Sequence, residues 1–407
     1  MLTKEKKQYK RNVVLDYLHM FFRNSNFTQG IWAAFLLIKG FTLIDIGIFE
    51  MVFHISGLVM EVPTGVLGDL WGRKTSRLLG ILTYFIYIAI MLFSMNFILI
   101  LIGFIFCGIS YTFESGSGDA LVYDSLKEIG EEHNFMKVNG KREVLYQVAS
   151  VLVLFITGLF LAGKHDTDFY LTAGMFVIAF IMILMMKETH IPHETKGKSF
   201  KQRINDHFVK TWKVVTSSKR LTLLIVMGAL LFAPVTSLFI WAQAYFKFQG
   251  FTENWMLYFL ALHSLTAAIG GLLAHKIENK LGEKLLMIVL PITLALCFWA
   301  TLIPTFGFIG FVVVGFVDSL FYVVLFDYIN RLIPSETRAS VLSFFGMCFS
   351  LVMIFTFPIM GWIGEATSIW YAYLFIAVII TIVVIILMSI IRNNHFDIQK
   401  DKITEST

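Results

Sequence analysis

The sequence has little cysteine, and what it has lies in apolar surroundings. Cys107, Cys297 and Cys348 are the three cysteines in 407 residues, and each stands inside a long apolar run. This isolation predicts neither a disulfide framework nor a zinc site. The sequence also lacks a phosphate-cradling P-loop and any nucleophile–base spacing. We therefore expect a chain that is not an enzyme, that ATP does not drive directly and that has no cofactor or metal.

Charge is scarce as well. Lys, Arg, Asp and Glu make up 15% of the residues, whereas soluble domains carry about 25%. The hydrophobic fraction is 57%. This composition excludes an ordinary soluble protein and places the chain among membrane proteins.

The apolar residues come in blocks of about 20, the length of helix that crosses about 30 Å of hydrocarbon. Short loops and the lack of an alternating pattern argue against a transmembrane β-barrel. We expect an all-α membrane protein with twelve transmembrane helices. The expected ranges are 16–38, 43–67, 75–95, 97–124, 142–163, 169–187, 219–246, 253–276, 283–303, 306–331, 338–363 and 369–392.

Lysine and arginine indicate the orientation. All but four of the 33 fall on segments that face the cytoplasm if the amino terminus is inside. The exceptions are Lys39, Lys164 and Lys247 on outer loops and Arg23 within the first helix. Positive charge concentrates on cytoplasmic loops, so both termini are predicted to be cytoplasmic, in a multi-pass protein of the plasma membrane. The net charge of +5 is then a topology signal and predicts no nucleic-acid partner.

The first apolar block is predicted to be a membrane helix rather than a removable signal peptide. Arg23, Asn24 and Asn26 interrupt it, and no small-residue cleavage site follows.

A polar stretch over residues 188–218 divides the chain into two sets of six helices, 1–187 and 219–407. Within it, apolar residues recur at helical spacing, which predicts an amphipathic helix on the inner membrane surface. These residues are Phe200, Ile204, Phe208, Trp212 and Val215. The alternative is a flexible tether.

The two sets resemble each other, as expected for pseudo-symmetric bundles. Helix 4 ends with VYDSL and helix 5 opens with KREVL, while helix 10 ends with LFDYI and helix 11 opens with TRASVL. Asp124 thus corresponds to Asp327, and Arg142 to Arg338.

The loop between helices 2 and 3 reads GVLGDLWGRKTSR, from Gly65 to Arg77. Gly65, Asp69, Gly72, Arg73 and Lys74 match the signature pattern G-x-x-x-D-x-x-G-R-K. With its six-plus-six helices and inside termini, the whole chain resembles the major facilitator superfamily. That resemblance implies a monomer that binds a small-molecule substrate within the lipid bilayer.

In that family this loop is a latch that stabilises the outward-facing state. The glycines would allow a close approach and a sharp turn, and Asp69 would face the amino end of a helix of the other half, such as helix 11. Arg73 would pair with Asp119 or Asp124 at the inner end of helix 4. The alternative is a positive-inside loop with no switching role.

Charges inside the membrane are costly and mark candidate functional residues. Arg23, Glu61 and Glu114 lie at similar expected depths on helices 1, 2 and 4. A buried arginine needs a carboxylate, so we expect these three to cluster. Asn26 and Gln29 extend the polar stripe on helix 1 and are candidates for the substrate cavity.

Helix 2 carries a row of Glu50, His54, Gly57 and Glu61, spaced by 4, 3 and 4 residues on one face. Such a row could carry protons, with His54, Glu61 and Glu114 as candidate coupling residues. The alternatives are that Glu50 lies at the outer surface and that His54 is a hydrogen-bonded packing residue.

In the second half, His263 and Asp318 lie at similar depth on helices 8 and 10 and are predicted to pair near the midplane. Helix 7 adds Trp241 and Gln243, beyond a kink expected at Pro234. These four residues are candidates for contact with substrate. The alternative is ordinary hydrogen bonding between helices.

EVPTG before the latch and GDALVYDSLKE in helix 4 are similar to bacterial efflux-type permeases of this superfamily. The resemblance implies a secondary-active transporter that exports a small, largely apolar compound in exchange for protons. Two departures weigh on the direction of transport: Phe104 stands where many exporters have arginine, and helix 5 has no proline. Proton-coupled uptake of a nutrient is the alternative, and a sensor or membrane enzyme is a third interpretation that no motif supports.

Overall fold

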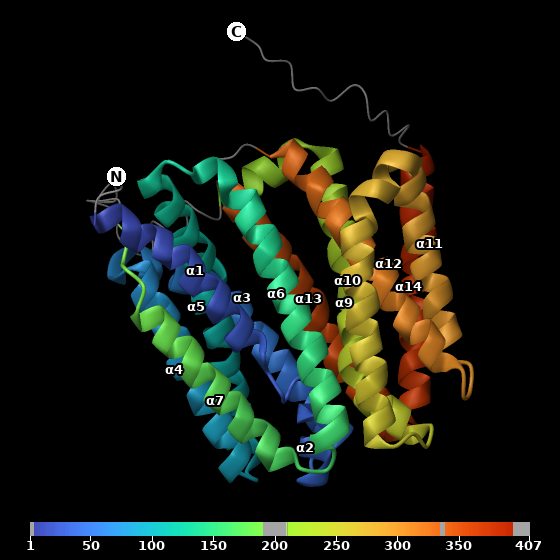
Figure 1. Cartoon of the computed structure of the whole chain (residues 1–407). Helices are drawn as coiled ribbons and strands as arrows, with labels where there is room; N and C mark the ends of the chain where they lie inside the picture. The colour runs from blue at the N-terminus through green and yellow to red at the C-terminus, as the bar shows by residue number, and fades with distance from the viewer. Residues whose placement is uncertain (1–3, 190–208, 210, 334–337, 394–407) are drawn as a thin grey trace.

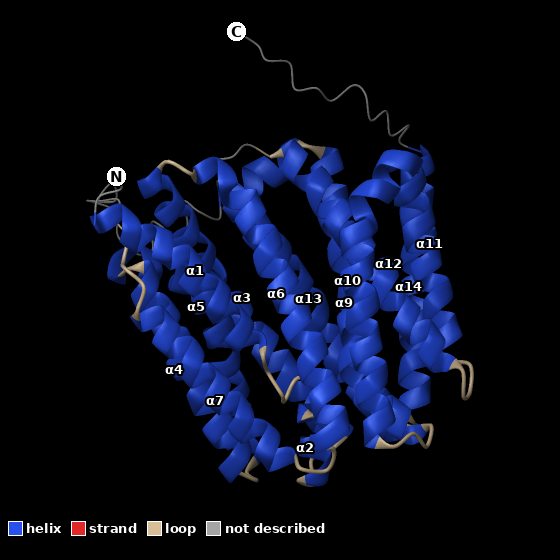
Figure 2. Ribbon diagram, in the orientation of Figure 1, coloured by secondary structure: helices blue, strands red, loops and turns tan. Residues whose placement is uncertain are grey.

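The computed structural model describes residues 4–189, 209, 211–333 and 338–393. Within these ranges the chain is helical, with short loops and no strand (Figure 2). The first half contains α1 (Lys4–Asn24), α2 (Trp32–Ile38), α3 (Leu43–Trp71), α4 (Arg73–Phe93), α5 (Phe97–Ile129), η1 (Glu132–Asn134), α6 (Phe135–Ile156), the π-helical η2 (Thr157–Leu161) and α7 (His165–Leu184). The second half contains α9 (Lys219–Phe248), α10 (Glu253–Leu281), α11 (Glu283–Thr301), α12 (Gly307–Leu332), α13 (Arg338–Ala366) and α14 (Ile369–Asn393).

Eleven stretches of the described residues are helices long and apolar enough to span a membrane. They correspond to the second to twelfth predicted spans. The all-helical membrane fold is thus confirmed.

The first predicted span is not one continuous helix, and here the prediction is wrong. The α-helix ends at Asn24 and resumes as α2 at Trp32. The Asn24 side-chain amide donates to Met20 O (2.7 Å), the Ser25 hydroxyl donates to Phe21 O (2.8 Å), and Asn26 Oδ1 accepts from the Thr28 N–H (3.0 Å). Short polar side chains that bond the local backbone compete with the helical ladder, which explains the break.

Several helices begin at the predicted residue because the preceding side chain caps them. Thr42 and Asp45 form a capping box at the start of α3, while Asn96 and Ser218 accept from the first backbone N–H groups of α5 and α9. These oxygens satisfy amides that the helix itself leaves unpaired.

The two halves repeat the same packing. In the first, α1 packs against α5, α6 and α7, and α3 against α5; in the second, α9 packs against α12, α13 and α14, and α10 against α12. These pairs occupy equivalent places in the two six-helix sets. The pseudo-symmetric architecture expected from the sequence is therefore present.

The halves join through α3 with α13 and α6 with α10. Helix α1 begins and α14 ends at one side of the molecule, here called the terminus face, and the opposite side is the far face (Figure 1). At the far face the Leu43 N–H donates to Glu365 (2.9 Å) and the Ala34 N–H to Gln243 (3.0 Å). A Cβ on Gly361 would lie 2.4 Å from Leu43 O, so glycine permits this backbone contact. The halves are closed together at the far face.

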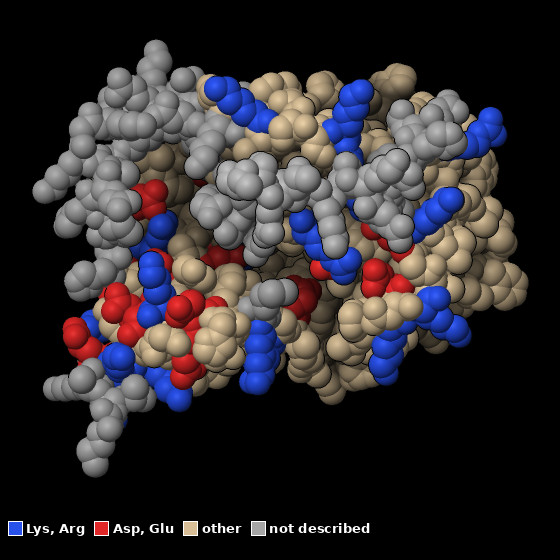
Figure 3. Space-filling model, turned by 90° about the horizontal axis from the view of Figure 1, so that it is seen from above, with Lys and Arg blue, Asp and Glu red and all other residues tan. Residues whose placement is uncertain are grey.

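Toward the terminus face the halves separate. Tyr322 on α12 interacts electrostatically with Tyr146 and Glu143 on α6 of the other half, yet Tyr322 is 47% and Tyr146 39% exposed. In the space-filling view of the terminus face, acidic side chains are recessed near its middle (Figure 3). A hollow therefore lies between the halves and opens to this face.

The predicted amphipathic helix falls mostly outside the described residues, as do Phe200, Ile204 and Phe208. Residues 211–217 are helical, Val215 is buried, and the exposed Trp212 ring lies 6.0 Å from the Phe344 ring. The boundaries of the linker and of the two halves remain predictions.

Candidate functional site

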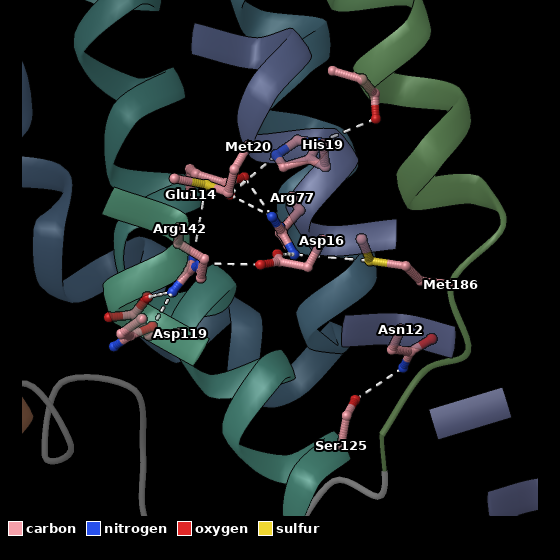
Figure 4. A network of polar contacts seen from close by, with 12 residues as sticks. Asn12, Asp16, His19, Met20, Arg77, Glu114, Asp119, Ser125, Arg142 and Met186 are labelled. Carbon is pink, nitrogen blue, oxygen red and sulfur yellow. Dashed lines mark hydrogen bonds and ion pairs between the residues drawn. The ribbon is translucent and has the colours of Figure 1, made fainter. Parts of the chain in front are cut away.

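A buried cluster of charged side chains occupies the first half, and Arg77 of α4 is at its centre (Figure 4). Arg77 Nη2 donates to Glu114 Oε1 (2.7 Å) and Nε to Glu114 Oε2 (3.2 Å), a two-point contact with α5. Arg77 Nη1 donates to Asp16 Oδ1 of α1 (2.8 Å). Arg77 and Asp16 are fully buried. One guanidinium thus joins three helices, which suits its fork of fixed N–H donors.

Arg142 of α6 extends the cluster toward the terminus face. Its Nε lies 2.9 Å from Asp16 Oδ2, and its Nη1 lies 2.5 Å from Asp119 Oδ1 and 2.7 Å from Asn139 Oδ1. Asp119 is largely exposed, so this end of the cluster reaches solvent. Two arginines and two buried carboxylates balance one another in charge.

His19 of α1 also contacts this cluster. Its Nδ1 lies 3.1 Å from Ala179 O of α7, and its Nε2 lies 3.2 Å from Glu114 Oε1. A carbonyl oxygen only accepts, so Nδ1 is the nitrogen that carries a hydrogen in its contact with Ala179. His19 therefore joins α1 to the backbone of α7 and to the Glu114 carboxylate of α5.

Sequence reasoning missed Asp16, His19 and Arg77. Arg77 reads as part of the positive loop, and Asp16 and His19 lie at the start of the expected first span. One signal was available: Arg77 follows Arg73 by four residues on the same helix, and Asp16 and His19 share a face of α1. No sequence pattern pairs these positions across helices.

The expected cluster of Arg23, Glu61 and Glu114 is not joined by ion pairs among the described residues, although Arg23 acts electrostatically on Glu114. Among the described residues the guanidinium of Arg23 lies over the Tyr111 ring (5.2 Å to the centroid), an attractive cation–π position. Glu114 pairs with Arg77 and His19 instead, because these side chains from α4 and α1 lie closer to it.

Glu61 lies where the halves meet. Its Oε1 accepts from the Ser115 hydroxyl of α5 (3.4 Å) and from the Ser343 hydroxyl of α13 in the other half (3.3 Å). Within the described chain no cation pairs with it. The carboxylate therefore touches both halves through neutral donors alone.

The predicted row on α3 is partly connected. His54 Nε2 lies 3.8 Å from Glu50 Oε2, and its Nδ1 lies 3.4 Å from the Ser350 hydroxyl of α13. Glu50 is buried, so its expected alternative place at the outer surface is wrong. His54 also stacks on Phe357 (centroids 6.0 Å apart). Both hydrogen bonding and packing hold His54 at the interface.

Asn26 and Gln29 bond within the first half. Asn26 Nδ2 donates to the Tyr84 hydroxyl (2.9 Å), and Gln29 Nε2 donates to Ser150 Oγ (2.9 Å). These contacts stabilise the break between α1 and α2. They also use the side-chain amides of Asn26 and Gln29, which the sequence predicts to line a substrate cavity.

In the second half, His263 and Asp318 do not pair. His263 Nδ1 bonds Phe311 O (2.8 Å), and its ring packs against Phe239 and Phe311. Asp318 Oδ1 is buried without a hydrogen-bond partner in the described chain, and Asp318 interacts electrostatically with Tyr322 of the hollow. The described residues show no contact between His263 and Asp318, and the backbone of α12 engages Nδ1 of His263.

Trp241 and Gln243 of α9 are both buried. Trp241 packs against Phe357 (centroids 6.2 Å apart), and its Nε1 has no partner among the described residues. Gln243 Oε1 accepts from the Ala34 N–H at the far-face closure. Gln243 therefore contributes to closing the far face in this conformation.

The signature loop forms the turn between α3 and α4. Asp69 and Arg73 pair within the loop (2.7 Å). In the described part of the chain Asp69 makes no ion pair with α13, and residues 334–337 before that helix lie outside it. Asp124 interacts with Arg73 electrostatically, whereas Asp119 pairs with Arg142. Of the two acids expected near Arg73, only Asp124 is close to it.

The segment after α7 crosses this turn. Glu188 accepts from the Lys74 N–H (3.0 Å), and Lys74 Nζ donates to Leu184 O and Met186 O (2.8 and 2.9 Å). Lys187 Nζ bonds Glu5 Oε1 (2.6 Å), and this hydrogen bond raises the pKa of Lys187. A carboxylate at the amino end of α4 meets the positive end of its dipole. The segment thereby ties α1, α4 and α7 together.

The two signature glycines differ in what surrounds them. Gly72 has φ +100° and sits against the Glu188 carboxylate, so it makes the sharp turn. A Cβ added at Gly65 would meet no described atom within 4 Å, and the close approach falls on Gly68, whose Cβ would lie 2.8 Å from Ser117 Oγ. The expectation of close approach at Gly65 is wrong for this conformation.

We predict that Gly72→Ala lowers the free energy of unfolding by about 1–3 kcal/mol, because a Cβ is strained at this φ and displaces Glu188. Gly65→Ala is the matched control and should be neutral or slightly stabilising, since it adds a better helix former in open space. Thermal unfolding in detergent measures both. Equal midpoints for the two variants would contradict this role of Gly72.

Within the described ranges, no three His, Cys, Asp or Glu residues are placed to hold a metal ion.

Comparison with known proteins agrees with this architecture. The family model of the Major Facilitator Superfamily matches residues 18–307. The MFS-type transporter YxaM of Bacillus subtilis (strain 168) is 21% identical over 383 residues, which are 91% of this chain and 94% of YxaM. The quinolone resistance protein NorA of Staphylococcus aureus (strain MSSA476) is 23% identical over 201 residues, about half of either chain.

Solved structures share the fold at low identity. The nucleoside transporter NupG superposes with a TM-score of 0.72 at 14% identity and covers 96% of this chain and 100% of its own. A bacterial homologue of the lysosomal transporter Spinster, in an inward-facing and unoccupied conformation, gives 0.72 at 14% identity, with 96% and 98% coverage. The D-xylose–proton symporter gives 0.67 at 13%, with 93% and 96% coverage. With a family model matched over most of its length and two equivalent helical halves, this chain belongs to the Major Facilitator Superfamily of membrane transporters.

Proposed function

We propose that the protein is a proton-coupled secondary transporter that exports a small, largely apolar compound by alternating access. One observation carries this proposal: the halves are closed at the far face and hollow toward the terminus face, and carboxylates without a cation partner among the described residues lie where the halves meet. These carboxylates are Glu61 and Asp318. Intramembrane acids of this kind are typical of proton pathways.

The orientation proposed from the positive residues makes the terminus face cytoplasmic. The structure is then an inward-facing state of a plasma-membrane protein that acts as a monomer. Asp69 pairs with Arg73 of its own loop in this state, as expected for a released latch. Closing the cytoplasmic side would bring Asp69 to the amino end of α13, and this movement is part of the proposal.

Among the candidate coupling residues, Glu61 is the one we assign to proton transfer. Glu114 contacts His19 and is paired with Arg77, whereas the partners of Glu61 in the described chain are hydroxyls, one from each half. A carboxylate held by neutral donors gains or loses a proton without breaking an ion pair. His54 is assigned to relay protons between Glu50 and the interface.

The substrate cavity is assigned to the hollow. Arg23 and Tyr111 lie together on one side. Glu143 and Tyr146 of α6 belong to the first half, and Asp318 and Tyr322 of α12 belong to the second. Aromatic rings around a few charged groups suit a largely apolar compound, since rings supply area and charges supply orientation. The other cavity candidates support the surrounding helices in this state and remain candidates for contact in another; they are Asn26, Gln29, His263, Trp241 and Gln243.

Export is favoured over uptake by the half-length similarity to NorA, a quinolone resistance protein. The nucleoside and D-xylose transporters share only the fold, and fold alone does not decide substrate or direction.

The test uses inside-out vesicles with an acidic interior and a pH-sensitive dye. We expect amphipathic compounds added outside to release protons at least about tenfold faster than in vesicles without the protein. Proton release by sugars or nucleosides but not by amphipathic compounds would support uptake of a nutrient. No release with any compound, from protein shown to be folded, would contradict proton coupling.

A further inference from the structure

At the far face a polar contact joins the two halves. His165, the first residue of α7, lies with Nε2 3.6 Å from Glu253 Oε2, and Glu253 is the first residue of α10 in the other half. The Gly163 N–H donates to Glu253 Oε1 (3.0 Å), and next to it Asn254 Nδ2 donates to Gly158 O (2.6 Å). Glu253 is thus held by the opposite half in the closed far face.

One turn further along α7 lies an acid that needs a partner. Asp168 is 0% exposed, and within the described part of the chain neither of its carboxylate oxygens has a hydrogen-bond partner. His165 Nδ1 is likewise buried and unpartnered there. Glu253 of the other half acts electrostatically on Asp168, and Asp168 lies one turn of α7 from His165, which contacts Glu253. An ionised carboxylate that is buried beside another one needs a cation or a proton.

The other charged groups nearby are already engaged or exposed. Lys164 Nζ donates to Phe160 O. Lys39 Nζ donates to Leu92 O and Ser94 O at the end of α4, and burial lowers the pKa of this lysine. Asp166 is exposed and interacts with Lys39.

Apolar packing encloses the remaining side. The Phe35 ring of α2 packs against His165 and Phe169, with centroids 6.2 and 4.7 Å away. Among the described residues, His165 is the one basic side chain within ion-pair distance of Glu253, and it lies one turn of α7 from Asp168.

We propose that His165, Asp168 and Glu253 form a proton-binding gate, in which a proton bound among them holds the two halves closed at the far face. Without the proton, the two carboxylates repel. With it, a charged imidazole pairs with Glu253 and offsets the charge of Asp168, or one acid is neutral and the repulsion ends. Because the closed state binds this proton more tightly, lowering the pH on the far side favours closure, and by linkage closure favours proton uptake.

This inference rests on the proposed alternating access, since it requires a state in which the far face opens. It is separate from proton transfer through Glu61, which lies at the interface on α3 rather than at the far-face ends of α7 and α10. The gate adds regulation by pH on the far side to the transport cycle.

The test measures the distance across the far face with two spin labels. Met95→Cys in the first half and Phe306→Cys in the second are suitable, because these side chains are 75% and 62% exposed on far-face loops. Cys107, Cys297 and Cys348 are replaced by serine. Between pH 8 and pH 5.5 we expect the ratio of short to long distances to rise by about fivefold or more.

Variants separate the gate from other effects of pH. His165→Gln should lose most of this rise and remain more open at pH 5.5, whereas Asp168→Asn should stay closed at both pH values because it removes the repulsion. His133→Gln, an exposed histidine on η1, is the matched control and should respond as the parent does. The proposed gate would be overturned if the distance ratio of His165→Gln rose between pH 8 and pH 5.5 as much as in the parent. It would also be overturned if the far face of Asp168→Asn opened at pH 8.

The same variants are run in the vesicle assay, which keeps the two proposals distinguishable. Compound-dependent proton release together with an unchanged pH response in His165→Gln would reject the gate alone. A pH-dependent distance without proton release by any compound would support the gate and reject the proposed coupling.

Discussion

Arg77→Ala is expected to lower the free energy of unfolding by about 3–5 kcal/mol, because it leaves the buried Glu114 without its arginine and Asp16 with Arg142 alone. Both acids lose charge-assisted hydrogen bonds of 2.7–3.2 Å, made between buried side chains. We expect a fall of about 5–10 °C in the thermal unfolding midpoint in detergent. The unfolding midpoint of Arg77→Lys should lie between those of Arg77→Ala and the parent protein, since lysine retains the charge but not the two-point contact with Glu114.

Arg331→Ala is the matched control for this prediction. Arg331 pairs with Asp327 four residues earlier on α12 at 2.5 Å, but both side chains are exposed. Exposed pairs contribute about 1 kcal/mol or less. The double variant Arg77→Gln, Glu114→Gln should lose less free energy of unfolding than the two single variants lose together. Each single variant leaves a buried charge unpaired, and the double variant removes both charges. If Arg77→Ala and Arg331→Ala unfold alike, the cluster does not stabilise the first half.

Glu61→Gln is expected to reduce compound-dependent proton release by at least about tenfold in the vesicle assay. Glutamine keeps the size of the side chain and an oxygen that can accept from Ser115 and Ser343, but it cannot exchange a proton. Equilibration of the compound down its own gradient should therefore stay within about twofold of the parent, because binding and movement do not require the charge. The change should therefore lower compound-dependent proton release and leave the stability of the folded protein unchanged.

Ser343→Ala is the control for the contact between halves, since it removes one hydrogen bond of Glu61 and leaves its carboxyl group. We expect it to retain coupled proton release. Full coupling in Glu61→Gln would contradict the assignment and transfer it to the His19–Glu114 pair. A loss of downhill equilibration as well as coupling would mean that Glu61 serves the movement of the halves.

The membrane class, the helical fold and most helix boundaries followed from the sequence alone. Blocks of about 20 apolar residues have few alternatives to a transmembrane helix, because every backbone polar group must be satisfied within the segment. Local caps such as Thr42 and Asn96 fix where helices begin, and they act over three residues. Signals of this short range are readable without knowing what lies next to the helix.

The polar partners were decided by the tertiary structure. Arg23 was expected to cluster with Glu61 and Glu114. Which cation reaches a carboxylate depends on the rotation and depth of several helices, and it is Arg77 that pairs with Glu114 once α4 packs on α5. The same holds for Glu61, whose two serine partners are 54 and 282 residues away, and for the meeting of His165 with Glu253. A sequence determines which charged side chains need partners in the membrane, because an unpaired charge there has a high desolvation free energy. Only the packed arrangement of the helices determines which partners they find.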